Sequence, residues 1–196
     1  MAPDIERALQ LIDAAHSEDP NKTTVSGGTE VPYELHYANK MTSYLTQRSP
    51  SASSNLRIAI RAQHFRRWEV PRASYPMTRI GYHQWRTYLK KRQGELVAAL
   101  IADCGFAAED CARVDALIRK EGLTKGDEEA QILEDVACLV FLDDQFEEFK
   151  EKHDEDKIMK ILQKTWGKMS DRGHAMALEM NMDADCSRLV EKALAG

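Results

Sequence analysis

The chain has 196 residues, which suits one domain and is long enough to bury a substantial core. Hydrophobic residues make up 43% and charged residues 30%, an ordinary balance for a globular protein, and the apolar runs are too short to span a membrane. The net charge of −5 argues against general nucleic-acid binding, although a local basic face could still bind RNA.

The four cysteines are widely spaced and include no C-x-x-C pair. This pattern is typical of reduced, mostly buried thiols, and a zinc site built from them is a minor alternative. The N-terminal residues lack a basic stretch followed by an apolar one, so no signal peptide is expected. We therefore expect an intracellular protein with a cytoplasmic location. The cysteines are Cys104, Cys111, Cys138 and Cys186.

Helical spacing of apolar residues recurs along the chain, beginning with Ile5, Ala8 and Ile12. No segment alternates with a period of two and no Asn-Gly turn is present, so strands are not expected, and the turn-rich segment 16–29 is predicted as a loop. The sequence predicts an all-α fold, a single compact helical domain over residues 1–196 with eight or nine helices. The predicted helices cover about residues 4–15, 33–47, 55–68, 81–103, 107–120, 127–152, 154–168, 170–180 and 183–194.

Prolines and glycines set the boundaries of the central helices. Pro71 disfavours helical backbone in the residue before it, so the helix that starts near residue 55 must end near Val70. Pro71 and Pro76 stiffen the loop that follows. Gly105 is expected as the C-terminal cap of the helix predicted over 81–103.

A basic segment, residues 57–92, contains ten lysines and arginines and one acidic residue, Glu69. Guanidinium groups beside aromatic rings can bind phosphate or carboxylate and stack on a planar group. The segment therefore predicts an anion-binding site in which Arg67, Arg72 and Arg86 converge. A solvated basic helix followed by an ordered loop is the alternative. The predicted ligand-binding residues are Gln63, Arg67, Trp68, Arg72, Arg79, Tyr82, Trp85 and Arg86.

An acidic stretch, residues 127–156, contains thirteen acidic residues and two lysines, most of which fit a solvated helix face. Asp135 differs because it falls on or beside the apolar stripe of its helix, where a carboxylate must be paired, hydrogen-bonded or metal-bound. A buried ion pair with an arginine of the basic segment is one reading, and a functional carboxylate is the other. Glu134 is a second candidate. His64 lies at the apolar edge of its predicted helix, where a satisfied core histidine is the alternative to a functional one.

Four segments carry a resemblance to a known family: 34–42 (ELHYANKMT), 63–72 (QHFRRWEVPR), 81–86 (GYHQWR) and 133–142 (LEDVACLVFL). Together they are similar to the uncharacterised domain-of-unknown-function family 4202, over about residues 4–180. A more distant likeness is to the HD superfamily of helical, metal-dependent phosphohydrolases. That likeness implies an HD-like fold in which His64 and Asp135 help to hold a divalent metal ion.

The HD pattern is incomplete in this chain. Phe65 stands where the paired aspartate should be, and the early histidine position aligns with Tyr37. Glu34, close to that position, joins His64 and Asp135 as a predicted metal ligand. Either the metal is held differently from the family pattern, or the fold is HD-like and has lost its metal.

These observations favour an HD-like hydrolase or related enzyme that acts on a phosphorylated or other anionic small molecule. The predicted catalytic residues are His64, Asp135 and Glu134, with His64 as general acid or base and Asp135 orienting water. The alternatives are a non-catalytic module that binds an anion or RNA, and a purely structural pairing of the arginines with the acidic helix.

Overall fold

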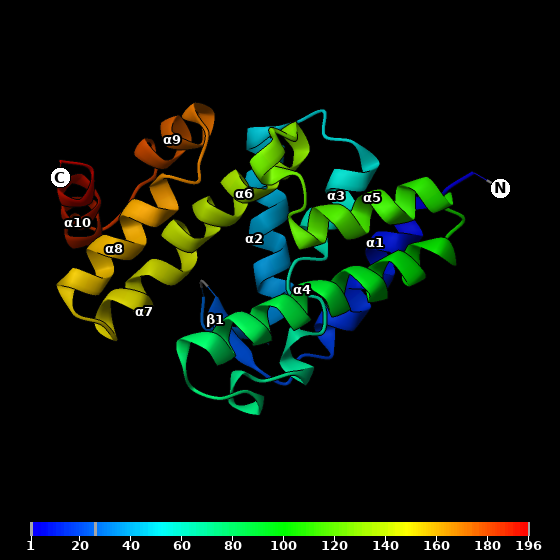
Figure 1. Ribbon diagram of the computed structural model, residues 1–196, viewed down its shortest axis with the longest axis horizontal. Helices are drawn as coiled ribbons and strands as arrows, with labels where there is room; N and C mark the ends of the chain where they lie inside the picture. The colour runs from blue at the N-terminus through cyan, green and yellow to red at the C-terminus, as the bar shows by residue number, and fades with distance from the viewer. Residues whose placement is uncertain (1, 26, 196) are drawn as a thin grey trace.

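The computed structural model describes residues 2–25 and 27–195, and this part of the chain is mostly helical. It contains ten α-helices and one two-stranded antiparallel sheet (Figure 1). The α-helices are α1 (Ile5–Ser17), α2 (Tyr33–Arg48), α3 (Ser54–Arg61), α4 (Arg79–Ala102), α5 (Ala108–Arg119), α6 (Glu128–Val140), α7 (Phe146–Glu151), α8 (Glu155–Trp166), α9 (Asp171–Leu178) and α10 (Ala184–Ala195). The predicted all-helical class is thus broadly confirmed.

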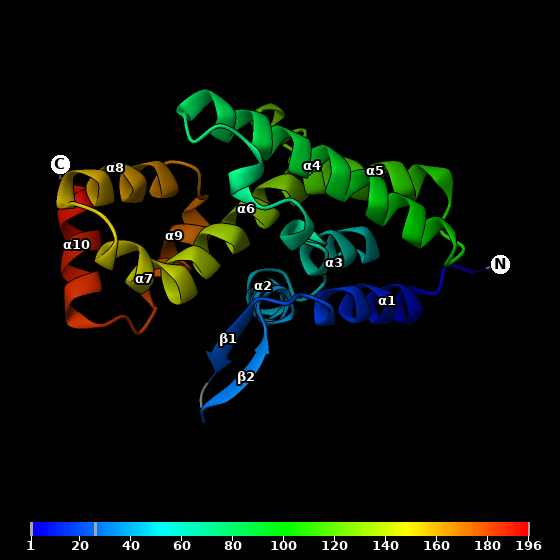
Figure 2. The same cartoon turned by 90° about the horizontal axis from the view of Figure 1, so that it is seen from below.

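The predicted absence of strands is wrong. Strand β1 (Lys22–Val25) pairs with β2 (Thr29–Pro32), with Lys22 opposite Pro32 and Val25 opposite Thr29. Gly28 has a φ of +79° and donates its N–H to the carbonyl of Val25, which helps to close the turn. Each strand is only four residues long and partly exposed, so its sequence does not show the alternation of apolar and polar residues from which strands are predicted. The hairpin extends from the body beside α2 (Figure 2).

The helix predicted over 55–68 ends early, at Arg61. Ser53 caps its start by accepting the N–H of Leu56, but the chain then leaves the helical conformation. His64 and Arg66 adopt positive φ angles of 66° and 49°. A left-handed backbone costs about 1–2 kcal/mol for a non-glycine residue, so other contacts must hold this segment in place.

The helix predicted over 127–152 is divided by a π-helical turn, Phe141–Gln145, into α6 and α7. This division raises the predicted eight or nine helices to ten. Asp127 caps the start of α6 by accepting the N–H of Ala130. π-Helical turns occur frequently at functional sites, and this one joins the two halves of the core.

Two clusters of buried residues form the core. The first involves α1 to α6 and includes Ile12, Met41 and Leu117, whereas the second involves α6 to α10 and includes Phe146 and Leu162. Helix α6 contributes to both clusters, because it is buried on most of its sides. It therefore connects the α4–α5 pair at one end of the molecule with α8 and α10 at the other (Figure 1). That residues 1–196 form a single domain stays a prediction.

Helices α4 and α5 pack closely enough to require a glycine. A Cβ atom at Gly94 would lie 2.0 Å from Oδ1 of Asp115 on α5. This close packing fixes the position of α4, whose first half carries several of the predicted site residues. None of the described helices combines the length and apolar character needed to cross a membrane.

Candidate functional site: a cationic cavity

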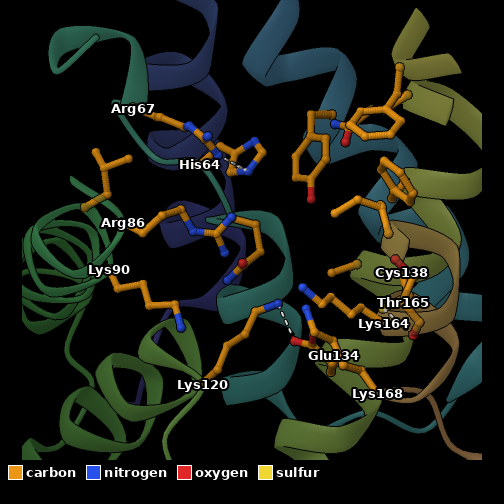
Figure 3. Close-up of a pocket in the computed structure, with 18 of the residues that line it drawn as sticks. His64, Arg67, Arg86, Lys90, Lys120, Glu134, Cys138, Lys164, Thr165 and Lys168 are labelled. Carbon is orange, nitrogen blue, oxygen red and sulfur yellow. Dashed lines mark hydrogen bonds and ion pairs between the residues drawn. The ribbon is translucent and has the colours of Figure 1, made fainter. Parts of the chain in front are cut away.

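A cavity of about 670 Å³ lies where the two core clusters meet. This volume falls within the range of small-molecule sites. Its walls come from α2, the segment 63–67, α4, the end of α5, α6, the π-helical turn, α7 and α8 (Figure 3). The polar and aromatic residues that line it include Tyr33, Tyr37, Gln63, His64, Arg67, Tyr82, Arg86, Lys90, Gln93, Lys120, Glu134, Cys138, Phe141, Glu148, Phe149, Lys152, Lys164 and Lys168.

The lining is strongly cationic in a chain that is acidic as a whole. Seven lysines and arginines border the cavity, against two glutamates, while the net charge of the chain is −5. Both glutamates are already paired with lysines. Glu134 contacts Lys120 at 2.5 Å and Lys168 at 3.6 Å, and Glu148 contacts Lys152.

Four cations at the cavity, Arg67, Arg86, Lys90 and Lys164, have no carboxylate within 4 Å among the described residues. Some arginines elsewhere are paired, as Arg113 is with Asp127 at 2.6 Å, whereas others such as Arg72 and Arg79 form no ion pair among the described residues. Burial lowers the pKa of Lys90, and the charges of Lys120 and Arg86 lower it further. Of the four, Arg86 and Lys164 are exposed and Arg67 and Lys90 are half-buried, and the charge of Glu134 offsets part of the repulsion at Lys90.

His64 and Arg67 form the upper part of the site in Figure 3. The guanidinium of Arg67 donates to Nε2 of His64 at 2.7 Å and lies 4.7 Å from the ring centre of Trp85. The imidazole of His64 stacks on Tyr37 at a centroid distance of 4.0 Å. Burial lowers the pKa of His64 well below its ordinary value, and the charges of Arg67 and Arg86 add to this effect. His64 is therefore neutral, with its proton on Nδ1.

Two buried polar atoms at the cavity lack a partner in the described part of the chain. They are Nδ1 of His64 and Nε2 of Gln93. Gln93 is only 6% exposed. A buried donor without an acceptor is costly and rare in native proteins. Both donors border the same cavity, so a ligand with acceptor oxygens could satisfy them.

Glu34 holds the strained segment that carries His64 and Arg67. Its carboxylate is buried and accepts the backbone N–H groups of Arg66 at 3.1 Å and Trp68 at 3.0 Å. His16, also buried, lies 3.2 Å from the same carboxylate and 2.9 Å from the carbonyl of Arg61. The two ring nitrogens of His16 thus connect Glu34 to the end of α3. Glu34 thus positions the loop rather than facing the cavity.

The three residues predicted as metal ligands do not come together. The carboxylate of Glu34 is occupied by the loop, and that of Asp135 by Arg48 at 2.9 Å and by Ser170. His64 is surrounded by cations, which would oppose a metal ion. Within residues 2–25 and 27–195, no group of three or more potential ligands is arranged to hold a metal. The residues present therefore do not fit the divalent metal that the HD likeness implies.

The predicted catalytic acids occupy different environments. Asp135 is fully buried, is not part of the cavity lining and holds an arginine. That arginine is Arg48, so the expected partner from the basic segment was wrong. Glu134 borders the cavity, and although burial opposes its ionisation, the charges of Lys120 and Lys168 hold its pKa below the ordinary value. Glu134 is therefore an ionised carboxylate that forms ion pairs with Lys120 and Lys168.

The predicted ligand-binding residues divide into two groups. Gln63, Arg67, Tyr82 and Arg86 line the cavity, and Trp85 supports Arg67 while donating its Nε1–H to the carbonyl of Val70. Trp68, Arg72 and Arg79 do not line it. Arg72 donates to the carbonyls of Tyr75, Pro76 and Thr78, so it braces its own loop. Of the three arginines expected to converge, Arg67 and Arg86 line the cavity and Arg72 does not. Arg79 is exposed.

The sequence pattern does not single out four lysines that complete the site: Lys90, Lys120, Lys164 and Lys168. Lysines on helices are usually solvated, so the presence of a lysine in a helical segment does not by itself indicate a binding site. Their spacing carries no signal either. Arg86 and Lys90 are four residues apart, as are Lys164 and Lys168, but the same spacing recurs at Arg57 and Arg61 and at Arg188 and Lys192.

The stability of the protein should depend on pH through His64. In the unfolded chain this residue takes up a proton below about pH 6.5, whereas its native pKa is lower. The unfolded state then binds more protons, so stability falls as the pH drops below about 6.5 until the native pKa is reached. His64→Asn, which tolerates positive φ, should remove up to about 1.4 kcal/mol per pH unit from this loss. Urea unfolding at about pH 7.5 and pH 5.5 measures the difference, and an unchanged pH dependence in the variant would contradict it.

The fold and the site define a helical protein with a cationic cavity between two parts of its core. Its sequence matches the family model described as "Domain of unknown function (DUF4202)" over residues 6–190, so the chain belongs to this family. The family resemblance of the sequence is thereby confirmed. No curated protein and no solved structure matches the chain, and the likeness to the HD superfamily is not shown.

Proposed function

We propose that the protein is an enzyme that binds a phosphorylated or other anionic small molecule in the cationic cavity. The observation that carries this proposal is the group of four cations, Arg67, Arg86, Lys90 and Lys164, that border one cavity without a carboxylate partner in the described residues. Clustered positive charges repel one another, and a bound anion offsets that repulsion. Guanidinium groups also match phosphate geometry. A cavity of about 670 Å³ that opens to solvent matches a small molecule in size, whereas RNA prefers an extended basic groove.

His64 is the side chain best placed to donate a hydrogen bond to a reacting group in this site. Its Nε2 accepts a hydrogen bond from Arg67, so the proton of the neutral ring is on Nδ1, which has no partner among the described residues. A neutral imidazole N–H can polarise a ligand oxygen by hydrogen bonding. Cys138 is a poor nucleophile because burial raises the pKa of its thiol to about 12.

Hydrolysis or transfer at a phosphoryl group is the reaction type that these residues support best. Arg67, Arg86 and the lysines would stabilise the negative charge on the phosphoryl oxygens, and the Nδ1–H of His64 would donate a hydrogen bond to the leaving oxygen. The leaving oxygen would take up the proton that the attacking water or hydroxyl loses. Asp135 has a structural role in this proposal, because its carboxylate is engaged by Arg48 and Ser170.

A binding module without catalysis is the second candidate. It is favoured by the pairing of both cavity glutamates with lysines, which leaves no free carboxylate there as a general base. Incubation with phosphorylated compounds separates the two candidates. Release of phosphate that depends on His64 supports the enzyme, and tight binding without turnover supports the module.

Anion binding should depend on the fork geometry of Arg86. Arg86→Lys keeps the positive charge but loses the planar pair of donors. We expect this variant to fold normally and to bind sulfate or phosphate at least about tenfold more weakly, a loss of roughly 1.4 kcal/mol. Thermal shift titrations measure the affinity.

Arg79→Lys is the matched control, because Arg79 lies on the same helix, is exposed and does not line the cavity. It should bind the anion as the wild type does. The proposal fails if no phosphate, nucleotide or carboxylate stabilises the wild type. It also fails if Arg86→Lys responds to these anions as the wild type does.

A further inference from the structure

We infer that the ligand of this cavity carries two phosphate groups, one held on the α4 side by Arg67, Arg86 and Lys90 and the other on the opposite side by Lys164 with Lys168. This inference rests on the proposed anion site and specifies its ligand class. A diphosphate ester and a bisphosphate share the required chemistry and differ in whether the two groups are adjacent or separated.

The number of unpaired charges supports two groups rather than one. Four cations at the cavity lack a carboxylate partner in the described residues. One phosphate ester carries a charge of about −1.5 to −2 near neutral pH, which would leave roughly half of this positive charge without a counterpart. Two phosphate groups bring about −3 to −4 and match it. Lys120 and Lys168 do not add to the excess in full, because they share Glu134.

The cations stand on opposite walls of the cavity. Arg86 and Lys90 come from α4, whereas Lys164 comes from α8 and Lys168 from the segment that follows it (Figure 3). Lys120 and Glu134 lie between these walls at the lower edge of the view. Each wall carries two cations spaced four residues apart, on one face of a helix or its extension. A ligand that reaches from one wall to the other would neutralise both pairs.

The remaining lining fits the organic part of such a ligand. Tyr33, Tyr37, Phe141 and Phe149 contribute aromatic surface from α2, the π-helical turn and α7. The unpartnered donors of His64 and Gln93 lie at the same cavity and can donate to phosphate or sugar oxygens. Gln93 is nearly fully buried, so its free donor marks a built site rather than a solvated surface.

The test compares ligands that differ only by one phosphate group. Isothermal titration measures phosphate against diphosphate, AMP against ADP, and a hexose monophosphate against the corresponding bisphosphate. We expect the two-phosphate member of at least one pair to bind at least about tenfold more tightly. A preference for diphosphate and ADP indicates adjacent groups, and a preference for the bisphosphate indicates separated ones.

Lys164→Ala provides the second arm of the test. It should weaken the preferred two-phosphate ligand by about tenfold and its one-phosphate counterpart by less than about threefold, because a single phosphate is held by the arginines. Lys160→Ala is the matched control, since Lys160 is an exposed lysine of the same helix that does not line the cavity. It should leave both affinities unchanged.

The outcomes separate this inference from the proposed function. Binding of one-phosphate ligands with no gain from a second phosphate would overturn the inference and leave the anion site standing. Equal weakening of both ligand types by Lys164→Ala would also overturn it, because the site would then hold a single group. Absence of binding by every anion would overturn the proposed function as well.

Discussion

Replacing Asp135 with alanine should lower the free energy of unfolding by about 3–5 kcal/mol, the usual cost of removing one partner of a buried ion pair. The carboxylate is fully buried and accepts from Arg48 at 2.9 Å, Gln131 at 3.0 Å and the backbone N–H of Ser170 at 2.8 Å. It thereby joins α6 to the end of α2 and the start of α9. The alanine variant leaves these donors without an acceptor in the core.

Urea unfolding monitored by circular dichroism measures this loss. Asp143→Ala is the control, because Asp143 forms a more exposed pair with Lys40 at 2.7 Å, and it should cost less than about 1 kcal/mol. Gly173→Ala tests the same contact from the other side, since its Cβ would lie 2.8 Å from Oδ1 of Asp135. Equal stability of the Asp135 and Asp143 variants would contradict a structural role for Asp135.

Replacing Glu34 with alanine should lower the free energy of unfolding by at least about 3 kcal/mol and also weaken anion binding. The substitution leaves the buried N–H groups of Arg66 and Trp68 and the ring of His16 without their acceptor, at about 1–3 kcal/mol each. The segment also loses the contacts that offset its left-handed backbone. Arg67 lies between the two anchored residues, so its guanidinium should no longer be held at the cavity.

Hydrogen exchange provides the specific readout for this variant. The amides of Arg66 and Trp68 should exchange faster in Glu34→Ala, while amides of the α4–α5 pair should change only as far as global stability does. Glu30→Ala is the control, because Glu30 is an exposed glutamate of the neighbouring hairpin. If Glu34→Ala keeps wild-type protection of these two amides and wild-type affinity for phosphate, Glu34 does not position the loop.

Local signals in the sequence account for most of the helices. The apolar spacing of α1 and α2 and the caps at Ser53 and Asp127 depend on residues within a turn or two of one another. The early end of α3 has no such signal, because the segment 62–69 contains neither glycine nor proline. Its conformation is decided by Glu34, which lies about thirty residues earlier in the chain. The strands of the β1–β2 hairpin are too short for a period-two pattern of apolar residues to be detected in the sequence.

The site could be predicted from the sequence only where its residues lie close together in the chain. Arg67, Arg86 and Tyr82 stand out because arginines and aromatic residues are concentrated in one segment. Arg72 belongs to that concentration too, yet its donors are used by three nearby carbonyls. The direction of a guanidinium depends on which acceptors are closest in the fold, and composition does not specify this.

The sequence alone determined that the chain is mostly helical, that it belongs to its family and that a basic segment is balanced by an acidic one, because these properties depend on residue types and short spacings. Only the tertiary structure decided which charges meet. In the fold, Asp135 pairs with Arg48, and Glu34 accepts hydrogen bonds from a strained loop. Lys164 of α8 lies across the cavity from Arg86 of α4 (Figure 3). The physical reason is that an ion pair or a shared cavity requires proximity in space. Helix packing creates that proximity between residues that are far apart in the chain.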